Sequence, residues 1–184
     1  MKKQFSRILY GGDYNPNQWP QDIWQEDMKL FEQASINSAT INVFSWAKLQ
    51  PSEDCYDFSE LDDIIAMLNQ NGHDIVLGTA TAAMPAWLVT KYPETARTDY
   101  EGRRHKFGQR HNACPNSLVY QKYSRLMASK LAERYGSDPS IVCWHVNNEY
   151  NGECYCENCE RAFRVWLRNK YKTLEAVNNA WNTE

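Results

Sequence analysis

The sequence has no hydrophobic run long enough to cross a membrane. Its most apolar window, residues 75–89, contains Gly78, Thr79, Thr81 and Pro85 and falls short of the roughly 20 apolar residues that a transmembrane helix needs. Basic residues are not in excess either, because 20 lysines and arginines face 23 acidic residues and the net charge is −3. We therefore expect neither a membrane protein nor a nucleic-acid-binding protein.

The sequence also lacks a secretory signal, a short-period repeat and a low-complexity linker. The start carries two lysines but no long apolar segment and no cleavage signal, so we expect a cytoplasmic protein. In a reducing cytoplasm the six cysteines are expected as thiols or metal ligands and not as disulfides. A chain of 184 residues has the size of one domain with a substantial core.

Strand patterns alternate with helix patterns along the chain. Short apolar runs predict strands at residues 8–12, 39–44, 74–78 and from 141 onward. Helical spacing predicts helices at residues 20–34, 59–72, 117–135, 157–171 and 174–181, with a short helix after the third strand. Such alternation indicates an α/β fold of parallel βαβ units. Two architectures remain, a doubly wound sheet and half of a (β/α)8 TIM barrel, because a whole barrel needs about 250 residues.

The stretch from Ile141 to Cys159 places two candidate sites side by side. Its β-branched start predicts a buried strand, and Asn147, Asn148 and Glu149 follow directly. The carboxyl ends of parallel strands are where α/β folds carry their catalytic groups, so Glu149 is a candidate acid or base. The competing interpretation is a solvated loop glutamate or a partner of a helix N-terminus.

A candidate metal site follows the fourth strand. Three cysteines occur there in the spacing C-x-C-x₂-C, namely Cys154, Cys156 and Cys159. A tetrahedral zinc site needs a fourth ligand, for which Cys114 in the long loop of residues 95–116 is the first candidate and His111 the competitor. A closed shell of four cysteines would be structural, since no position is left for water. The alternative is a set of unpaired thiols or a redox dithiol.

Aromatic and small side chains near the strand ends allow two interpretations. Trp19, Trp46 and Trp87 follow the first three strands, where an indole suits stacking on a sugar but is as often part of the core. Cys143 and His145 lie within the fourth strand, and we expect both in the core.

Five motifs together resemble the β-galactosidases of glycoside hydrolase family 42, and the resemblance covers essentially all 184 residues. The motifs are GGDYNPNQWP at 11–20, FSWAKLQPSEDCYDFSELD at 44–62, LGTATAAMPAWLVTKYPE at 77–94, GRRHKFGQRHNACPNS at 102–117 and WHVNNEYNGECYCENC at 144–159. Two residues depart from the family pattern, because Asn17 stands where the family has Glu and Asn147 where Asp is common.

The resemblance implies a retaining glycosidase that cleaves terminal β-D-galactosides, with residues 1–184 as the first, partial segment of the catalytic barrel domain, about four βα units. It implies Glu149 as the proton donor and Arg110 and Asn148 as contacts to the sugar. It further implies a homotrimer for the intact enzyme. The implied structural zinc is held by Cys114, Cys154, Cys156 and Cys159.

Retaining hydrolysis also needs a second carboxylate, about 5–5.5 Å from the first. Asp13 is the only acidic residue near another strand end, and nothing assigns it that role. We therefore expect the nucleophile and the rest of the barrel outside this sequence, and the isolated chain to be inactive. The alternatives are a non-catalytic, zinc-stabilised sugar-binding or remnant module, an α-L-arabinopyranosidase, and a thiol redox or metal-trafficking protein.

Overall fold

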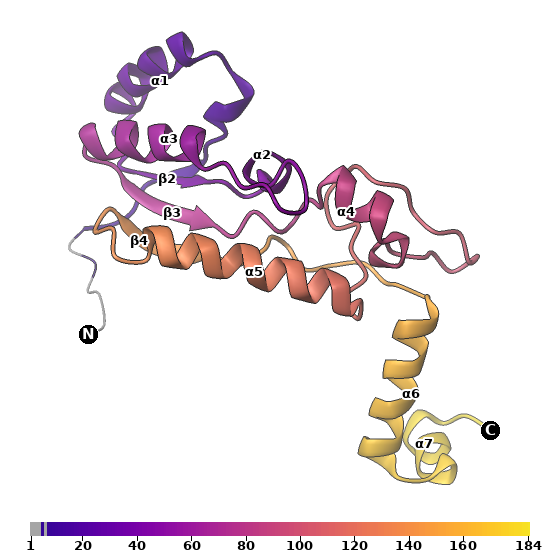
Figure 1. Cartoon of the computed structure of the whole chain (residues 1–184). Coiled ribbons are helices and arrows are strands. Elements are labelled where there is room, and N and C mark those ends of the chain that lie inside the picture. Colours follow the sequence, from indigo (N-terminus) through magenta and orange to yellow (C-terminus); the bar gives the residue numbers. More distant parts are fainter. Residues whose placement is uncertain (1–4, 6) are drawn as a thin grey trace.

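Four parallel strands form one sheet in the computed structural model (Figure 1), which describes Phe5 and residues 7–184. Residues 1–4 and 6, where we expect no secretory signal, lie outside the described residues. The strands are β1 (Gly11–Asp13), β2 (Ser38–Ile41), β3 (Asp74–Gly78) and β4 (Ile141–His145), in the order β1-β2-β3-β4. Each strand lies beside the next one in sequence, as in a barrel, whereas a doubly wound sheet reverses its order. The fold is the N-terminal half of a (β/α)8 barrel.

Helices connect the strands and cover one face of the sheet. The three that follow β1, β2 and β3 and pack on it are α1 (Gln21–Gln33), α3 (Ser59–Gln70) and α5 (Leu118–Tyr135). Four shorter helical segments lie in the connections, namely η1 (Pro16–Gln18), α2 (Trp46–Leu49), α4 (Ala86–Lys91) and η2 (Pro93–Thr95). After β4, α6 (Glu157–Tyr171) and α7 (Leu174–Trp181) extend away from the sheet (Figure 1). In the described part of the chain no helix combines the length and apolar character that crossing a membrane requires.

Several predicted boundaries are wrong. The first strand is Gly11–Asp13 and not residues 8–12, and Ile8 is 88% exposed. The second strand ends at Ile41, because Asn42 takes a left-handed conformation with φ 65°. The helix predicted over residues 59–72 begins at Ser59 but ends at Gln70.

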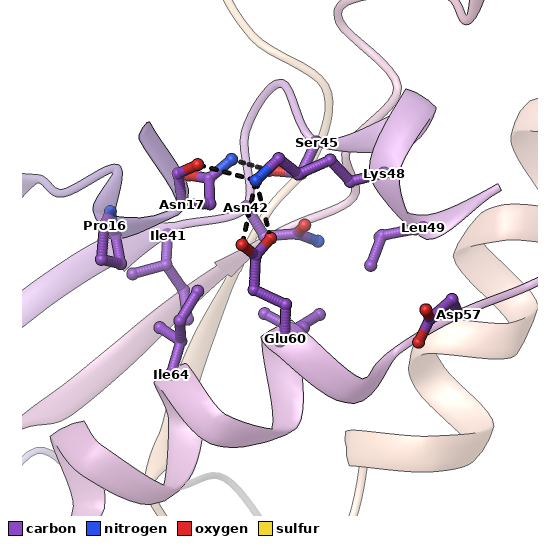
Figure 2. A pocket seen from close by; sticks show the side chains of 11 residues that line it. Pro16, Asn17, Ile41, Asn42, Ser45, Lys48, Leu49, Asp57, Glu60 and Ile64 are labelled. Atoms are coloured by element: carbon purple, nitrogen blue, oxygen red, sulfur yellow. Dashed lines mark hydrogen bonds and ion pairs between the residues drawn. The ribbon is translucent and has the colours of Figure 1, made fainter. Parts of the chain in front are cut away.

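A pocket of about 280 Å³ lies between η1, α2 and α3 on the helix-covered side of the sheet (Figure 2). Lys48 reaches across it and donates to the backbone oxygen of Asn17 at 2.7 Å and to both carboxylate oxygens of Glu60 at 2.9 Å. The Asn17 side chain donates to Ser45 Oγ at 3.4 Å. The ammonium group is thus neutralised by Glu60, and it fastens η1 and α2 onto α3.

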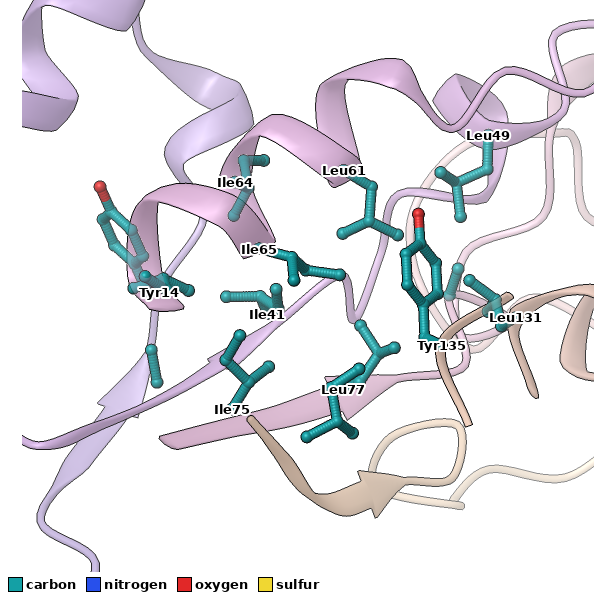
Figure 3. Close-up of a cluster of buried hydrophobic side chains, with 14 of the residues drawn as sticks. Tyr14, Ile41, Leu49, Leu61, Ile64, Ile65, Ile75, Leu77, Leu131 and Tyr135 are labelled. Carbon is teal, nitrogen blue, oxygen red and sulfur yellow. The ribbon is translucent and has the colours of Figure 1, made fainter. Parts of the chain in front are cut away.

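The hydrophobic core lies between the sheet and its helices (Figure 3). Ile75 and Leu77 of β3 are fully buried and lie in register with Ala39 and Ile41 of β2, so alternate residues of both strands face the helices. The helix side chains that meet them include Leu61, Ile64, Ile65, Leu131 and Tyr135. Each such aliphatic side chain contributes about 1.5–3 kcal/mol by burial, and this packing holds the strand ends in place.

β4 is less buried than the sequence predicts. It pairs with β3 alone, and only Ile141 of its five residues is buried. Cys143 was expected in the core but is exposed, because it lies in register with Val76, on the face of the sheet opposite to that of the helix-facing Ile75 and Leu77. His145 is half-buried and has a hydrogen-bond partner in Asn148.

Candidate functional site

Three residues in left-handed conformation turn the chain at the carboxyl edge of the sheet. They are Asn42, Ala80 and Asn147, with φ values of 65°, 64° and 58°. The Asn42 side chain donates to the backbone oxygen of Gly78 at 2.9 Å and joins the ends of β2 and β3. The Asn147 backbone N–H donates to Thr79 Oγ1 at 2.9 Å, which fastens the end of β4 to the loop after β3. The polar residues that follow the strands are therefore gathered at one edge.

Asn148 is the most buried polar residue of the Asn147–Glu149 segment, with 7% exposure. Its Oδ1 lies 3.1 Å from Nε2 of His145, and its Nδ2 donates across 3.5 Å to Nε2 of His111. Its backbone N–H donates to Asn147 Oδ1 at 2.8 Å. The side-chain amide is thereby fixed between two imidazoles at the strand end.

Glu149 presents its carboxylate at the same edge. Its side chain is 60% exposed, and Oε2 lies 3.3 Å from Nη2 of Arg110. The guanidinium group of Arg110 also lies over the ring of Phe44, 5.8 Å from its centroid. An ion pair this exposed contributes about 1 kcal/mol or less to stability. The two residues that the resemblance links to catalysis and sugar binding thus meet from two distant loops.

Backbone geometry at Glu149 is unusual. Its φ is 37°, a region that costs a non-glycine residue about 1–3 kcal/mol and that concentrates at functional sites. In the described part of the chain, the backbone groups of Glu149 and Tyr150 form no hydrogen bond. The backbone of Glu149 is therefore anchored through its neighbours, Asn148 before it and Asn151 after it.

The four predicted cysteine ligands converge. The sulfur atoms of Cys114, Cys154, Cys156 and Cys159 all lie within 4.8 Å of one another. Cys114 Sγ is 3.4 Å from Cys156 Sγ and 3.5 Å from Cys159 Sγ. Four thiolates around zinc at about 2.3 Å would stand about 3.8 Å apart, so the residues fit a tetrahedral metal ion. His111, the competing ligand, contacts Asn148 instead.

Local donors and burial act on these thiols in opposite directions. Burial raises the pKa of the Cys114 thiol well above its ordinary value, and it also raises the pKa of Cys159. Burial is the largest influence on the pKa of Cys156 and opposes its ionisation, but hydrogen bonds from the backbone N–H groups of Cys159 and Asn158 and from the Cys114 and Cys154 thiols together outweigh it and lower the pKa of that thiol. The backbone N–H of Thr98 donates to Cys154 Sγ at 3.5 Å. A metal ion is what would let all four sulfurs carry negative charge together.

A pocket of about 290 Å³ lies between the cysteine-bearing loop and the segment after β4. Its walls include Arg97 and Tyr120, which sequence reasoning did not single out. The Tyr120 hydroxyl accepts from Asn147 Nδ2 at 3.1 Å and donates to the backbone oxygen of Thr81 at 3.2 Å. Burial raises the pKa of Tyr120 above its ordinary value, so this hydroxyl stays protonated. No local sequence pattern identifies Arg97 or Tyr120 as part of this pocket, because the residues that they contact are distant in sequence.

The three tryptophans after the strands differ in their surroundings. Trp46 is fully buried in the core. Trp87 packs against the core and donates from its indole to the backbone oxygen of Gln50 at 2.8 Å. Trp19 is 60% exposed, so it alone of the three retains an accessible face for stacking on a sugar.

Half a (β/α)8 barrel with a carboxylate, an arginine and a buried amide at its carboxyl edge fits one part of a glycoside hydrolase site, which also needs a second carboxylate. The family model described as β-galactosidase, that of glycoside hydrolase family 42, matches residues 13–184. The chain belongs to this family.

Individual relatives agree with that assignment. The chain is 60% identical to the β-galactosidase LacZ of Lactobacillus acidophilus over 179 residues, which cover 97% of this chain and 27% of the relative. The crystal structure of a β-galactosidase from Bacillus circulans superposes with a TM-score of 0.91 at 58% identity, covering 97% of this chain and 26% of that one. A catalytic mutant of Gan42B, a family 42 β-galactosidase from G. stearothermophilus, gives a TM-score of 0.90 at 45% identity, covering 95% and 26%. The chain thus spans about a quarter of the length of these relatives.

Proposed function

We propose that the chain is the N-terminal part of the catalytic barrel domain of a retaining β-galactosidase, which hydrolyses terminal non-reducing β-D-galactosides. Glu149 is the acid/base of this reaction, and Arg110 and Asn148 contact the sugar. The observation that carries the proposal is the meeting of Arg110 and Glu149, 3.3 Å apart, at the carboxyl edge of the sheet.

In this reaction Glu149 first protonates the leaving oxygen and then, as a carboxylate, activates water for the second step. Arg110 balances the negative charge that Glu149 carries between the two steps, and its remaining N–H groups suit sugar hydroxyls. The amide of Asn148, held between His145 and His111, presents a fixed donor and acceptor instead of a mobile one. Its low exposure reduces the entropy that would be lost on binding.

The second carboxylate belongs to a later part of the barrel. In the solved Gan42B mutant a catalytic glutamate is replaced at a residue number above 184, the length of this chain. That position supports a nucleophile outside residues 1–184, about 5–5.5 Å from Glu149 in the intact site. The isolated chain is then inactive, and the intact enzyme, a cytoplasmic homotrimer in our proposal, carries out the hydrolysis.

In this proposal Cys114, Cys154, Cys156 and Cys159 would hold a structural zinc ion. With four cysteine ligands, the ion would act as a crosslink and leave no position open for water. It would tie the loop of residues 95–116 to the start of α6, where Cys156 is the N-cap residue. Metal analysis of gently purified protein is expected to give one zinc per chain, and a metal-free protein would contradict this site.

The test of Glu149 uses an intact enzyme in which residues 1–184 replace the matching segment of the Lactobacillus acidophilus relative. Glu149→Gln is expected to slow hydrolysis of alkyl galactosides, whose leaving groups need a proton, about 10²–10⁴-fold. The first step on dinitrophenyl galactoside is spared, because that leaving group departs unprotonated. Side-by-side rates on α-L-arabinopyranosides show whether the related activity is preferred.

The matched control is Glu101→Gln. Glu101 is also exposed and also pairs with an arginine, with 3.2 Å between Glu101 Oε2 and Arg103 Nη2, but it lies away from the strand end. This variant is expected to keep normal rates on both substrates. Near-normal alkyl galactoside hydrolysis by Glu149→Gln would refute the acid/base role.

A further inference from the structure

Arg97 lies in the long loop with its backbone fixed on both sides. Its N–H donates to the backbone oxygen of Asn112 at 2.9 Å, and its carbonyl accepts from the N–H of His105 at 2.8 Å. The preceding residue, Ala96, forms a bridge with Ala113, next to the ligand Cys114. The side chain of Arg97 therefore starts from the rigid part of the loop that carries the cysteine.

The guanidinium group of Arg97 reaches the segment that follows Glu149. Nη2 donates to the backbone oxygen of Asn151 at 2.9 Å. Nε is buried and, in the described part of the chain, has no hydrogen-bond partner. Leaving a buried donor unsatisfied costs free energy. The other contacts of the guanidinium group must offset this cost for the orientation to persist.

Gly152 is shaped to receive this guanidinium group. A Cβ atom at Gly152 would lie 1.8 Å from Nη1 of Arg97 and 2.8 Å from its Cζ. The φ of Gly152 is also +74°, which disfavours any other residue. The planar group thus lies directly against the backbone of Gly152, with space for hydrogen only.

We propose that Arg97 is a positioning residue for Glu149. It holds the Asn151 carbonyl and packs against Gly152, and so it sets the path of residues 149–152. Asn148 fixes the other end of this segment, while the backbone of Glu149 itself has no hydrogen bond in the described residues. The backbone path that presents the carboxylate therefore depends on Arg97, while Arg110 contacts the carboxylate itself. This inference rests on the proposed acid/base role of Glu149.

The first measurement is hydrogen exchange on the intact chimeric enzyme described above. Arg97→Ala is expected to speed exchange at the N–H groups of Asn148 and Tyr155, which flank the segment and donate to Asn147 Oδ1 and to the backbone oxygen of Thr98, while peptides from α3 and α5 keep their protection. Arg97→Lys, which retains the charge and one donor, is expected to restore part of the lost protection. The matched control is Arg103→Ala, because Arg103 lies on the same loop and, in the described residues, forms ion pairs with Asp99 and Glu101. Unchanged exchange at both flanking N–H groups in Arg97→Ala overturns the proposal.

The second measurement is a double-mutant cycle in the intact chimeric enzyme described above. Gly152→Ala alone suffers both the φ penalty and the clash with Arg97, whereas in the Arg97→Ala background only the φ penalty remains. The loss in kcat caused by Gly152→Ala is therefore expected to be smaller in that background by a factor of about 3 or more, as for residues in contact. Equal losses in both backgrounds would show that the two residues act independently and would overturn the proposal.

The third measurement separates positioning from general destabilisation. A misdirected acid is expected to lower kcat on alkyl galactosides about 10–100-fold more than the first step on dinitrophenyl galactoside. A merely structural loss would lower both by the same factor and would overturn the proposal. Glu149→Gln is the reference: if that variant shows no leaving-group dependence, the proposed function fails, and the exchange result still decides whether Arg97 holds the segment.

Discussion

Gly78 offers a direct test of how tightly the carboxyl edge of the sheet is packed. A Cβ atom at this last residue of β3 would lie 2.9 Å from the backbone oxygen of Ile41 and 2.9 Å from both N and Cα of Val43. All three are backbone atoms, so no side-chain rotation can relieve the contact. Overpacking of this kind costs about 1–3 kcal/mol. Gly78→Ala is therefore expected to push β3 away from the segment that leaves β2.

Gly12 in β1 is the matched control for Gly78. It is also a strand glycine, but a Cβ atom there would meet nothing within 4 Å. Replacing either glycine by alanine restricts the unfolded chain and gains about 0.4–1 kcal/mol. This gain is common to both variants, so the difference in the free energy of unfolding between Gly12→Ala and Gly78→Ala isolates the clash, about 1–3 kcal/mol.

Thermal unfolding followed by circular dichroism measures this difference. For a chain of 150–250 residues, 1 kcal/mol corresponds to about 2–4 °C in Tm, so Gly78→Ala is expected to melt roughly 2–12 °C below Gly12→Ala. Coincident melting curves for the two variants would mean that the strand end adjusts freely. The close contact between β3 and the chain after β2 would then not hold the edge in place.

Two further predictions concern pH and metal. Hydrogen bonds from Lys91, Tyr123 and Tyr92 lower the pKa of Glu53 from 4.5 to about 2. The stability that this carboxylate contributes is thus complete above pH 4.5 and lost as the pH falls toward 2. Between pH 5 and 2.5, the denaturant midpoint of Glu53→Gln is therefore expected to fall less steeply than that of the unmodified chain. Parallel slopes for the two proteins would contradict this prediction. Cys114→Ser is expected to abolish stoichiometric zinc binding, as measured by metal analysis. Cys55→Ser is expected to retain it, because Cys55 is an exposed thiol outside the cluster. A Cys114→Ser variant that still binds one zinc would exclude Cys114 as a ligand.

Local patterns were enough to place the regular elements. β3, α6 and α7 have the bounds that the sequence predicts, because apolar spacing and flanking turn residues act within the element itself. Prediction from local patterns fails where residues distant in sequence determine the bounds of an element or the exposure of a side chain. The first strand begins three residues later than predicted, since its pairing with β2 starts at Gly11 and Ser38. Cys143 is exposed because its register with Val76 places it on the face of the sheet away from the helices, which its own residue type does not reveal.

The choice between two architectures needed the strand order. Alternating strands and helices fit both a doubly wound sheet and a barrel, because each βαβ unit has the same local pattern in either fold. The motifs that resemble family 42 favoured the barrel, and the order β1-β2-β3-β4 confirms it. The choice of a fourth candidate ligand was also left open by spacing. In the folded chain Cys114 lies within the cysteine cluster, whereas His111 contacts Asn148.

The carboxyl edge shows why the candidate site was only partly predictable. Asn42 and Asn147 sit in left-handed turns that asparagine tolerates, so their position after a strand is a readable signal. Ala80 adopts the same conformation with φ 64°, but an alanine residue gives no sequence signal for a left-handed turn. Glu149 and Cys114 could be chosen by residue type and spacing, whereas Arg97 is distinguished only by what it touches 54 positions further along the chain. The candidate residues of the site can therefore be predicted from local motifs. The direction of their side chains cannot, because it depends on contacts between loops that only the folded chain brings together.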